Sequence, residues 1–382
     1  MKIRVSLAAM VYFGLTTFGL TVLLAGCTVV PPKGAPTNSV NTCLERRIAF
    51  DIGSGSSKFQ VADVDICQQK IFKSILEGQN KVDYKDDLSQ SQDHKFGDKI
   101  QKEGLAAIEN SLDLAKKNGV VSHKQMAGVA TAAFREAQNA AEFTARIQAK
   151  TGLSVHVISQ REEGILGYYS ALASTELYDQ DSLPNVKNLF VWDIGGGSAQ
   201  MTYRMETLSS SMGSEGGFQV YEGKLASVSF KNQFMTNVQN KSEGKTPNPI
   251  SRGQSQKGLR WVESYAQKNT PSEVKELIKH ANGIVYGIGG VLSISVRNQT
   301  GKKQFKLQDI MTAIEQRLGK SDEEIGGKYA STDLTNLILV AGYMKALGVV
   351  EVRTLRVNNT SGILINPRYW LVTDGAFGSS SK

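Results

Sequence analysis

Cysteine and histidine are scarce in this sequence of 382 residues, which contains 3 cysteines and 4 histidines. The histidines show no spacing typical of metal ligands, and no cysteine lies near a histidine in the sequence. Structural and catalytic zinc sites draw most of their ligands from these two residue types. The sequence therefore disfavours a zinc site, and it disfavours a cysteine nucleophile that a neighbouring histidine would activate.

Acidic residues are also outnumbered, with 36 Asp and Glu against 44 Lys and Arg, which gives a formal net charge of +8. A positive net charge favours anionic partners, although charge alone does not exclude a basic surface that binds nothing. The chain is longer than a single hydrophobic core usually supports, and its length predicts two domains.

Long apolar runs are limited to one, Val5–Leu24, which is followed at residues 24–27 by LAGC. This pattern is typical of a bacterial lipoprotein, so we expect residues 1–26 to be a signal peptide and Cys27 to carry lipid. Residues 27–43 would then be a lipidated tether, and the body would lie in the cell envelope. Because Thr28 is not an aspartate, we expect the outer membrane, facing the periplasm, in a Gram-negative cell. An uncleaved membrane anchor is the alternative, since the run is long enough for a short span.

Two similar motifs organise the rest of the chain. Residues 48–59 read IAFDIGSGSSKF, and residues 189–200 read LFVWDIGGGSAQ. Each is an apolar strand that ends in Asp-Ile-Gly and small residues, followed by a second predicted strand. Such a turn can aim backbone N–H groups at a phosphate, and the aspartate can hold a hydrated divalent cation. A single Asp-x-Gly would more often be a hairpin turn, but the repetition predicts two related halves that face one phosphate and metal site.

The pair of motifs resembles the phosphate turns of the actin-like ATPase fold, and within it those of the exopolyphosphatase / guanosine pentaphosphate phosphohydrolase (Ppx/GppA) family. Three further stretches resemble that family's motifs: ATAAFREAQN at 130–139, VISQREEG at 157–164 and YGIGG at 286–290. Their order and spacing agree from about Glu45 to Trp370. No long helical domain follows the core, so the chain resembles a short, two-domain form.

The resemblance implies an α/β protein with two actin-like (ribonuclease H-like) domains and a cleft between them. We expect the N-terminal domain at residues 44–170, the C-terminal domain at 171–375 and a disordered tail at 376–382. The family further implies Mg²⁺ or Mn²⁺ as cofactor, a phosphoanhydride rather than a nucleic acid as partner and, by analogy alone, a homodimer.

The candidate site residues follow from the motifs. Asp51 and Asp193 would hold the metal, and Arg135 would bind phosphate oxygens with its planar guanidinium. The backbone of the three turns would bind phosphate at Gly53, Ser54, Gly55, Ser56, Ser57, Gly195, Gly196, Gly197, Ser198, Gly289 and Gly290. By resemblance, Glu163 is the catalytic residue that accepts a proton from the attacking water, with Arg135 assisting.

Two positions depart from the family pattern. Gln200 stands where the family has a glutamate, which removes a carboxylate near the metal and phosphates. Gly55 stands where the first turn usually has an asparagine, which loosens that turn. These departures keep a second hypothesis open: a non-catalytic, polyanion-binding envelope lipoprotein that retains the fold.

The first hypothesis is a metal-dependent phosphohydrolase that removes terminal phosphate from inorganic polyphosphate or a related phosphoanhydride. A kinase needs ATP, which is scarce outside the cytoplasm, so the predicted location favours a hydrolase. The location also disfavours the intracellular alarmone as the natural substrate. Hydrolysis of a nucleoside triphosphate or of guanosine pentaphosphate is a further alternative.

Several local predictions can be compared with a structure. If Arg46–Asp51 and Lys58–Asp63 form a hairpin, Cys43 and Cys67 face each other at its open end, and they form either a disulfide or two free thiols. The pattern also predicts helices at Asp98–Lys117 and Arg135–Thr151. Loops are expected at Lys81–Lys95 and Lys241–Gly258, and the second of these is basic enough to contact a polyanion.

Overall fold

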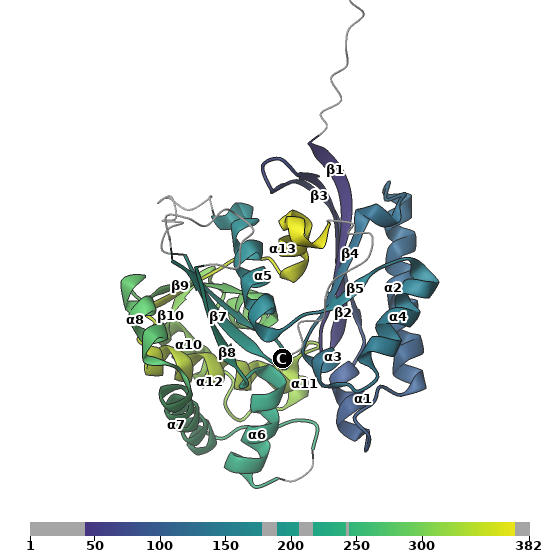
Figure 1. Ribbon diagram of the computed structural model, residues 1–382. Coiled ribbons are helices and arrows are strands. Elements are labelled where there is room, and N and C mark those ends of the chain that lie inside the picture. Colours follow the sequence, from purple (N-terminus) through teal and green to yellow (C-terminus); the bar gives the residue numbers. More distant parts are fainter. Residues whose placement is uncertain (1–42, 178–188, 206–216, 242–243, 371–382) are drawn as a thin grey trace, which may run out of the picture. The chain divides into compact units, whose positions relative to one another are not determined.

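Two mixed β-sheets with helices packed around them form the body of the chain (Figure 1). The structure is a computed structural model that describes residues 43–177, 189–205, 217–241 and 244–370. The described residues belong to one compact unit. The predicted signal peptide, Cys27 and the C-terminal tail lie outside the described residues. Within the described ranges, no helix is both long enough and apolar enough to cross a membrane.

The first sheet has the strand order β3-β2-β1-β4-β5. Its strands are β1 (Leu44–Ile52), β2 (Ser56–Asp65), β3 (Lys70–Lys81), β4 (Met126–Ala130) and β5 (Val155–Val157). The first three form an antiparallel meander, and β4 and β5 continue the sheet parallel to β1. Asp51 pairs with Lys58 and Arg46 pairs with Asp63, so the predicted register of this hairpin is confirmed.

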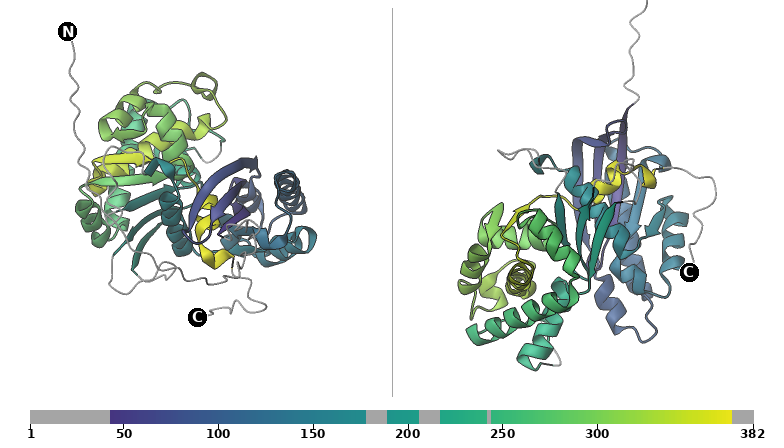
Figure 2. Two further views of the ribbon diagram at one scale, coloured as in Figure 1. Left: turned by 90° about the horizontal axis from the view of Figure 1, so that it is seen from above. Right: turned by 60° about the vertical axis from the view of Figure 1, so that its left-hand side comes forward.

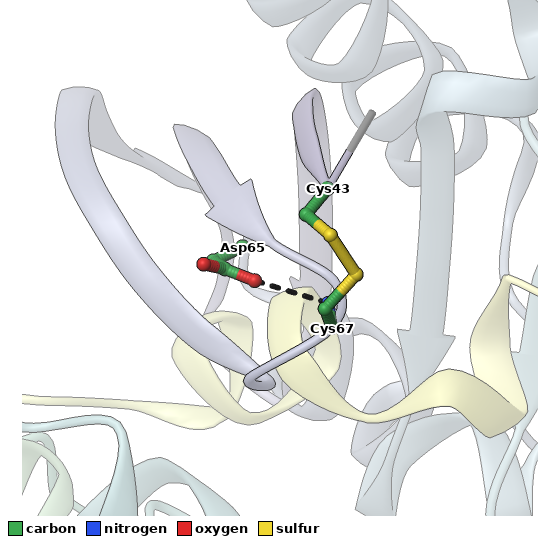
Figure 3. A group of neighbouring side chains, drawn as sticks. All are labelled: Cys43, Asp65 and Cys67. Atoms are coloured by element: carbon green, nitrogen blue, oxygen red, sulfur yellow. Dashed lines mark hydrogen bonds between the residues drawn. A yellow bond between two sulfur atoms is a disulfide. The ribbon is translucent and has the colours of Figure 1, made fainter. Parts of the chain in front are cut away.

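Cys43 and Cys67 are joined by a disulfide at the open end of that hairpin, with their Cα atoms 5.4 Å apart (Figure 3). The Asp65 carboxylate accepts hydrogen bonds from the backbone N–H groups of Cys67 (3.1 Å) and Gln68 (2.9 Å). The side chains of Cys43, Asp65 and Cys67 could offer ligand atoms within 4.8 Å of one another. However, a disulfide leaves no thiolate for a metal ion. The Asp65 carboxylate instead stabilises the turn between β2 and β3 through its two hydrogen bonds.

Helices on the outer side of the first sheet enclose its core, which is rich in aromatic residues (Figure 1). They are α1 (Tyr84–Gln90), α2 (Asp98–Lys117), α3 (Ala132–Glu136) and α4 (Ala140–Thr151), with a 3₁₀ turn at His123–Gln125. Tyr84, Phe96, Phe134 and Phe143 pack against one another with ring centroids 4.9–6.3 Å apart. α2 has the predicted bounds because its apolar residues recur at helical spacing and face this core.

Two local predictions in this half were wrong. The expected single helix Arg135–Thr151 is interrupted between α3 and α4, because the side chain of Asn139 binds the backbone of Phe96 twice. Asn139 Oδ1 accepts from the N–H of Phe96 (2.9 Å), and Nδ2 donates to its carbonyl (3.0 Å). The expected loop Lys81–Lys95 contains α1, because burial of Tyr84 and Leu88 in the core stabilises a short helix there.

The second sheet repeats the plan of the first, with the order β10-β11-β9-β6-β7-β8. Its strands are β6 (Phe190–Ile194), β7 (Ala199–Arg204), β8 (Phe218–Gly223), β9 (Ile284–Ile288), β10 (Gln304–Lys306) and β11 (Glu351–Thr354). β6, β7 and β8 form an antiparallel meander, whereas β9 pairs with β6 in parallel, as β4 does with β1. The sequence repeat therefore corresponds to a structural repeat.

The largest core lies between this sheet and its helices. These helices are α6 (Ser227–Gln239), α7 (Arg252–Asn269), α8 (Ser272–His280), α9 (Arg297–Thr300), α10 (Leu307–Glu315), α11 (Asp322–Ile325) and α12 (Ala330–Leu347), with a π-helical segment η4 (Val291–Val296). α12 is buried along most of its length and ends at Gly348, whose φ of +73° lies in the left-handed region that favours glycine.

The basic segment Lys241–Gly258 is not a loop throughout. α7 begins at Arg252 because Ser251 supplies a capping box. The preceding stretch is tied down by side-chain hydrogen bonds, among them Asn248 Nδ2 to Asp322 Oδ1 (2.7 Å). The described part of this segment therefore has a defined conformation.

Two helices lie between the sheets: α5 (Gln160–Leu172) and α13 (Asn359–Ile365), with short 3₁₀ turns at Thr175–Leu177 and Pro367–Tyr369 (Figure 2). α5 packs on the second sheet, and α13, near the end of the chain, packs on β1 and β2 as well as on α5. They share an apolar core with residues of both sheets. The domain limits at residues 44–170 and 171–375 stay a prediction.

Candidate active site

The two repeated motifs form turns of the same construction. In the first, the N–H of Gly53 donates to the carbonyl of Ser56, and in the second the N–H of Gly195 donates to that of Ser198, both at 2.9 Å. Asp51 stands one residue before the end of β1, and Asp193 stands one residue before the end of β6. Equivalent backbone bonds thus hold an aspartate beside each turn.

These turns approach each other closely. A β-carbon placed on Gly197 would lie 2.9 Å from Ser54 Oγ and 3.4 Å from Ala132 Cβ, and one on Gly196 would lie 4.0 Å from Ser54 Cβ. A larger residue at position 197 would separate the turns, so glycine is needed there for packing. The predicted meeting of the two halves therefore takes place at the glycines.

Three carboxylates are buried around this meeting point: Asp51, Asp193 and Glu163. Burial raises the pKa of Asp193 to about 6; Lys58 acts in the opposite direction, and the charge of Asp51 adds to the rise. Lys58 Nζ lies 3.6 Å from Asp51 Oδ2, across the β1–β2 pair. Lys58 was not among the predicted site residues, although the predicted hairpin register places it opposite Asp51.

Glu163 lies on the first turn of α5 and is 7% exposed. Its Oε2 is 2.9 Å from Nη2 of Arg135, while Nη1 of Arg135 donates to the carbonyl of Ile158 (3.0 Å). Burial raises the pKa of Glu163 to about 7, against the attraction of Arg135, and the charges of Asp193 and Asp51 raise it further. A carboxylate with such a pKa can exchange a proton near neutral pH.

The neighbouring acid, Glu162, has a different position. Its Oε2 accepts from the N–H of Ser159 (2.8 Å) in a capping box, and its Oε1 lies 2.6 Å from Arg368 Nη2. Glu162 therefore caps α5 and pairs at the surface, whereas Glu163 points into the buried group. The two acids diverge because consecutive residues on a helix differ by about 100° in direction.

A short chain of hydrogen bonds connects the second turn to Glu163. Gln200 Nε2 donates to Ser198 Oγ (3.0 Å), and Ser198 Oγ lies 3.4 Å from Glu163 Oε2. The β-carbon that Gly164 lacks would lie 3.3 Å from Gln200 Cβ. The departure at position 200 thus places a neutral donor where the family pattern has a carboxylate.

The third glycine-rich turn leaves space for an aspartate. Gly289 has a φ of +76°, and a β-carbon there would lie 2.0 Å from Asp193 Oδ1. Any other residue would be strained and would clash with the carboxylate. Gly290 is the N-cap residue of η4 and has no such contact within the described residues. Gly289 therefore shapes the space around Asp193.

The first turn is fixed from its outer side. The carbonyls of Ser54 and Gly55 accept hydrogen bonds from the segment after β3. Ser56 and Ser57 already belong to β2 and are buried, and Ser57 Oγ lies 3.3 Å from the hydroxyl of Tyr84. Burial raises the pKa of Tyr84 to about 12, so this hydroxyl stays protonated. Ser57 thus faces the core.

The site has the donors that a hard divalent cation prefers. Asp51 and Asp193 offer carboxylate oxygens, which are typical ligands of Mg²⁺, and such an ion usually keeps several waters. The residues present therefore fit a hydrated Mg²⁺ or Mn²⁺ ion.

Comparisons with known proteins show which family model and which folds this chain resembles. Residues 62–237 match the model of the Ppx/GppA phosphatase family. The crystal structure of the Aquifex aeolicus Ppx/GppA family member superposes with a TM-score of 0.63 at 16% identity, over 85% of this chain and 98% of that chain. An exopolyphosphatase from Cytophaga hutchinsonii gives 0.60 at 12% identity, over 84% and 96%. No curated protein matches the sequence. The predicted fold class is confirmed: the chain has the actin-like ATPase fold.

Proposed function

We propose that this chain is a metal-dependent phosphohydrolase that removes terminal phosphate from inorganic polyphosphate or a related phosphoanhydride. The match of residues 62–237 to a phosphatase family supports a phosphohydrolase. The similar structures include exopolyphosphatases, which favours polyphosphate among the substrates.

The observation that carries the proposal is the position of Glu163. This buried carboxyl group lies 3.4 Å from the hydroxyl of Ser198 in the second turn and 2.9 Å from Arg135. Two turns with equivalent backbone bonds meet beside it. An acid with a pKa near 7, next to turns suited to phosphate, is what a general base for water attack requires.

Each residue would then have a distinct task. Asp51 and Asp193 would hold the divalent cation, which neutralises charge on the phosphate oxygens when it is bound. Glu163 would take the proton of the attacking water. A bound phosphate would compete with Glu163 for the guanidinium of Arg135. Since Arg135 lowers the pKa of Glu163, its transfer to the phosphate would make Glu163 a stronger base.

Phosphate release by the full-length chain in detergent tests the proposal. The substrates are long-chain polyphosphate, ATP and guanosine pentaphosphate, each with Mg²⁺ and with EDTA. We expect Mg²⁺-dependent release from polyphosphate that Glu163→Gln abolishes. Glu162→Gln is the matched control, because it removes the neighbouring carboxylate outside the buried group and should keep most of the activity. Equal activity of wild type and Glu163→Gln would refute the assignment of the base.

One observation favours the second candidate, a polyanion-binding protein without catalysis. Gln200 supplies no charge beside Ser198 and Glu163. Binding of polyphosphate without release from any of the three substrates would support that candidate over the hydrolase.

We also propose that the chain is a lipoprotein of the cell envelope, anchored through Cys27. The apolar run and the LAGC sequence support this proposal. Labelling with an alkyne fatty acid, lost in Cys27→Ser, would test it, and fractionation would identify the membrane. Retention of the label in Cys27→Ser would refute lipidation at this residue. The homodimer stays a prediction.

A further inference from the structure

A buried oxygen without a partner lies at the start of α13. The side chain of Asn359 is 5% exposed, and its Oδ1 has no hydrogen-bond partner among the described residues. Its neighbours are all engaged: Asn358 Oδ1 accepts from the N–H of Thr360 (3.0 Å). The hydroxyls of Thr360 and Ser361 donate to Gln60 Oε1 at 3.1 and 2.9 Å. The helix start is therefore fixed without help from the side chain of Asn359.

This oxygen borders the same space as Asp193. A β-carbon placed on Gly167 of α5 would lie 3.9 Å from Asn359 Oδ1 and also 3.9 Å from Asp193 Oδ2. Ile288 closes the space from another side, with Cδ1 at 3.1 Å from the same point. Gly167, which lacks a β-carbon, therefore leaves a small space that borders two oxygens from different parts of the chain, and Ile288 limits its size.

Both oxygens accept hydrogen bonds, so an ionised Asp193 and Asn359 Oδ1 cannot satisfy each other. A buried acceptor without a partner is costly, and native proteins rarely keep one without a reason. A group that donates hydrogen bonds or carries positive charge would satisfy both oxygens. A hydrated divalent cation is such a group, because its waters donate hydrogen bonds outward.

We infer that Asn359 is a further oxygen donor of the cation site at Asp51 and Asp193, where its Oδ1 holds a water of the hydrated ion. The inference deepens the proposed function, because it rests on a cation at these two aspartates. It assigns to α13 a role in ion binding beyond packing against β1 and β2.

The chemistry of an amide suits this position. The site already contains the carboxylates of Asp51, Asp193 and Glu163, and each further negative charge would raise the pKa of Glu163. Asn359 adds a ligand oxygen without adding a charge. An ion held in this way would join β1, β6 and α13, so cation binding should also stabilise the packing of α13 against the first sheet.

Binding of Mn²⁺ alone, without any phosphate substrate, tests the inference. Titration calorimetry on the full-length chain gives the Kd, and electron paramagnetic resonance counts the bound ions. Asn359→Leu keeps the volume of the side chain but removes the oxygen. We expect it to raise the Kd about tenfold or more, as loss of outer-shell partners does in other metal sites. Asn359→Asp retains an oxygen and should bind at least as tightly as the wild type.

Asn358→Leu is the matched control, because it removes the cap of α13 and leaves the Asn359 oxygen in place. It should bind Mn²⁺ with a Kd within about twofold of the wild type. If Asn358→Leu and Asn359→Asp weaken binding as much as Asn359→Leu, the position of α13 matters rather than the oxygen, and the inference is overturned. An Asn359→Leu variant with the wild-type Kd, or a wild type that binds no Mn²⁺, also overturns it.

Thermal melting provides a second readout. Without metal, Asn359→Leu should melt at the same or a higher temperature than the wild type, because it removes an unsatisfied buried oxygen. The rise in melting temperature on adding Mn²⁺ should shrink. A large loss of stability of the metal-free variant would instead show that Asn359 has a structural partner, and would overturn the inference. If Mn²⁺ binding depends on Asn359 but no substrate releases phosphate, the cation site stands and the proposed hydrolase fails.

Discussion

The raised pKa of Glu163 predicts a pH dependence of folding stability that can be measured without a substrate. Folding moves this carboxyl from a pKa of 4.5 to about 7, mainly by burial. Between these values the folded protein holds a proton that the unfolded chain has released. The contribution of Glu163 to folding stability is therefore fully present below about pH 4.5, and it is lost as the pH rises towards 7. In the metal-free protein, Glu163, the proposed general base, therefore destabilises the fold at neutral pH.

The size of the effect follows from the shift. A difference of one pKa unit corresponds to about 1.4 kcal/mol, so a rise from 4.5 to about 7 implies a loss of about 3 kcal/mol. Asp193, with a pKa raised from 3.8 to about 6, acts in the same direction over a lower range of pH. Replacing Glu163 by Gln should remove the first contribution and leave the second.

Chemical denaturation in EDTA at a series of pH values from about 4.5 to 8 measures this slope. We expect the unfolding free energy of the wild type to fall more steeply than that of Glu163→Gln, by about 3 kcal/mol over the range. Loss of the contact with Arg135 shifts the whole curve of the variant but not its slope, because arginine stays charged throughout. Glu162→Gln should keep the wild-type slope. Parallel curves for wild type and Glu163→Gln would refute the burial argument.

The remaining predictions concern the same site and the disulfide. Gly289→Ala should abolish Mn²⁺ binding in calorimetry, because its β-carbon would displace the Asp193 carboxylate; unchanged binding would contradict the packing argument. Gln200→Glu should move the acid limb of the kcat/KM profile to higher pH, since a new buried carboxylate raises the pKa of Glu163; an unmoved limb would show that the charge lies too far away. Cys67→Ser should cost about 3 kcal/mol in chemical denaturation without changing phosphate release, because the disulfide lies at the opposite end of the hairpin from the turn; a coupled loss of activity would contradict this separation.

Much of the fold could be predicted where the sequence carries a local pattern. The hairpin register followed from the symmetry of the strands around Ser54–Gly55, and it placed Cys43 and Cys67 opposite each other. The same register paired Lys58 with Asp51. Lys58 could therefore have been identified as a site residue from the sequence, since a lysine opposite a candidate metal ligand is a clear electrostatic signal.

Other features depend on contacts between distant parts of the chain. The break between α3 and α4 needs Asn139 to reach the backbone of Phe96, which no helical periodicity reveals. α13 is a helix of only 7 residues whose apolar stretch resembles a strand or a loop in the sequence. The proximity of Asn359 and Asp193 to Gly167 arises only because α13 folds back against α5, which no local pattern predicts.

The two halves of the repeat are not equivalent in charge, and this asymmetry bears on the departure at Gln200. In the first half Lys58 faces Asp51 across the hairpin, and in the second half Gln200 occupies the matching position opposite Asp193. With the three carboxylates ionised, the cations Lys58 and Arg135 leave the site one negative charge in excess, and one divalent ion would make it positive. A glutamate at position 200 would leave the site neutral with the same ion. We therefore interpret Gln200 as a substitution that lets a single divalent ion attract a phosphate anion, and it is compatible with catalysis.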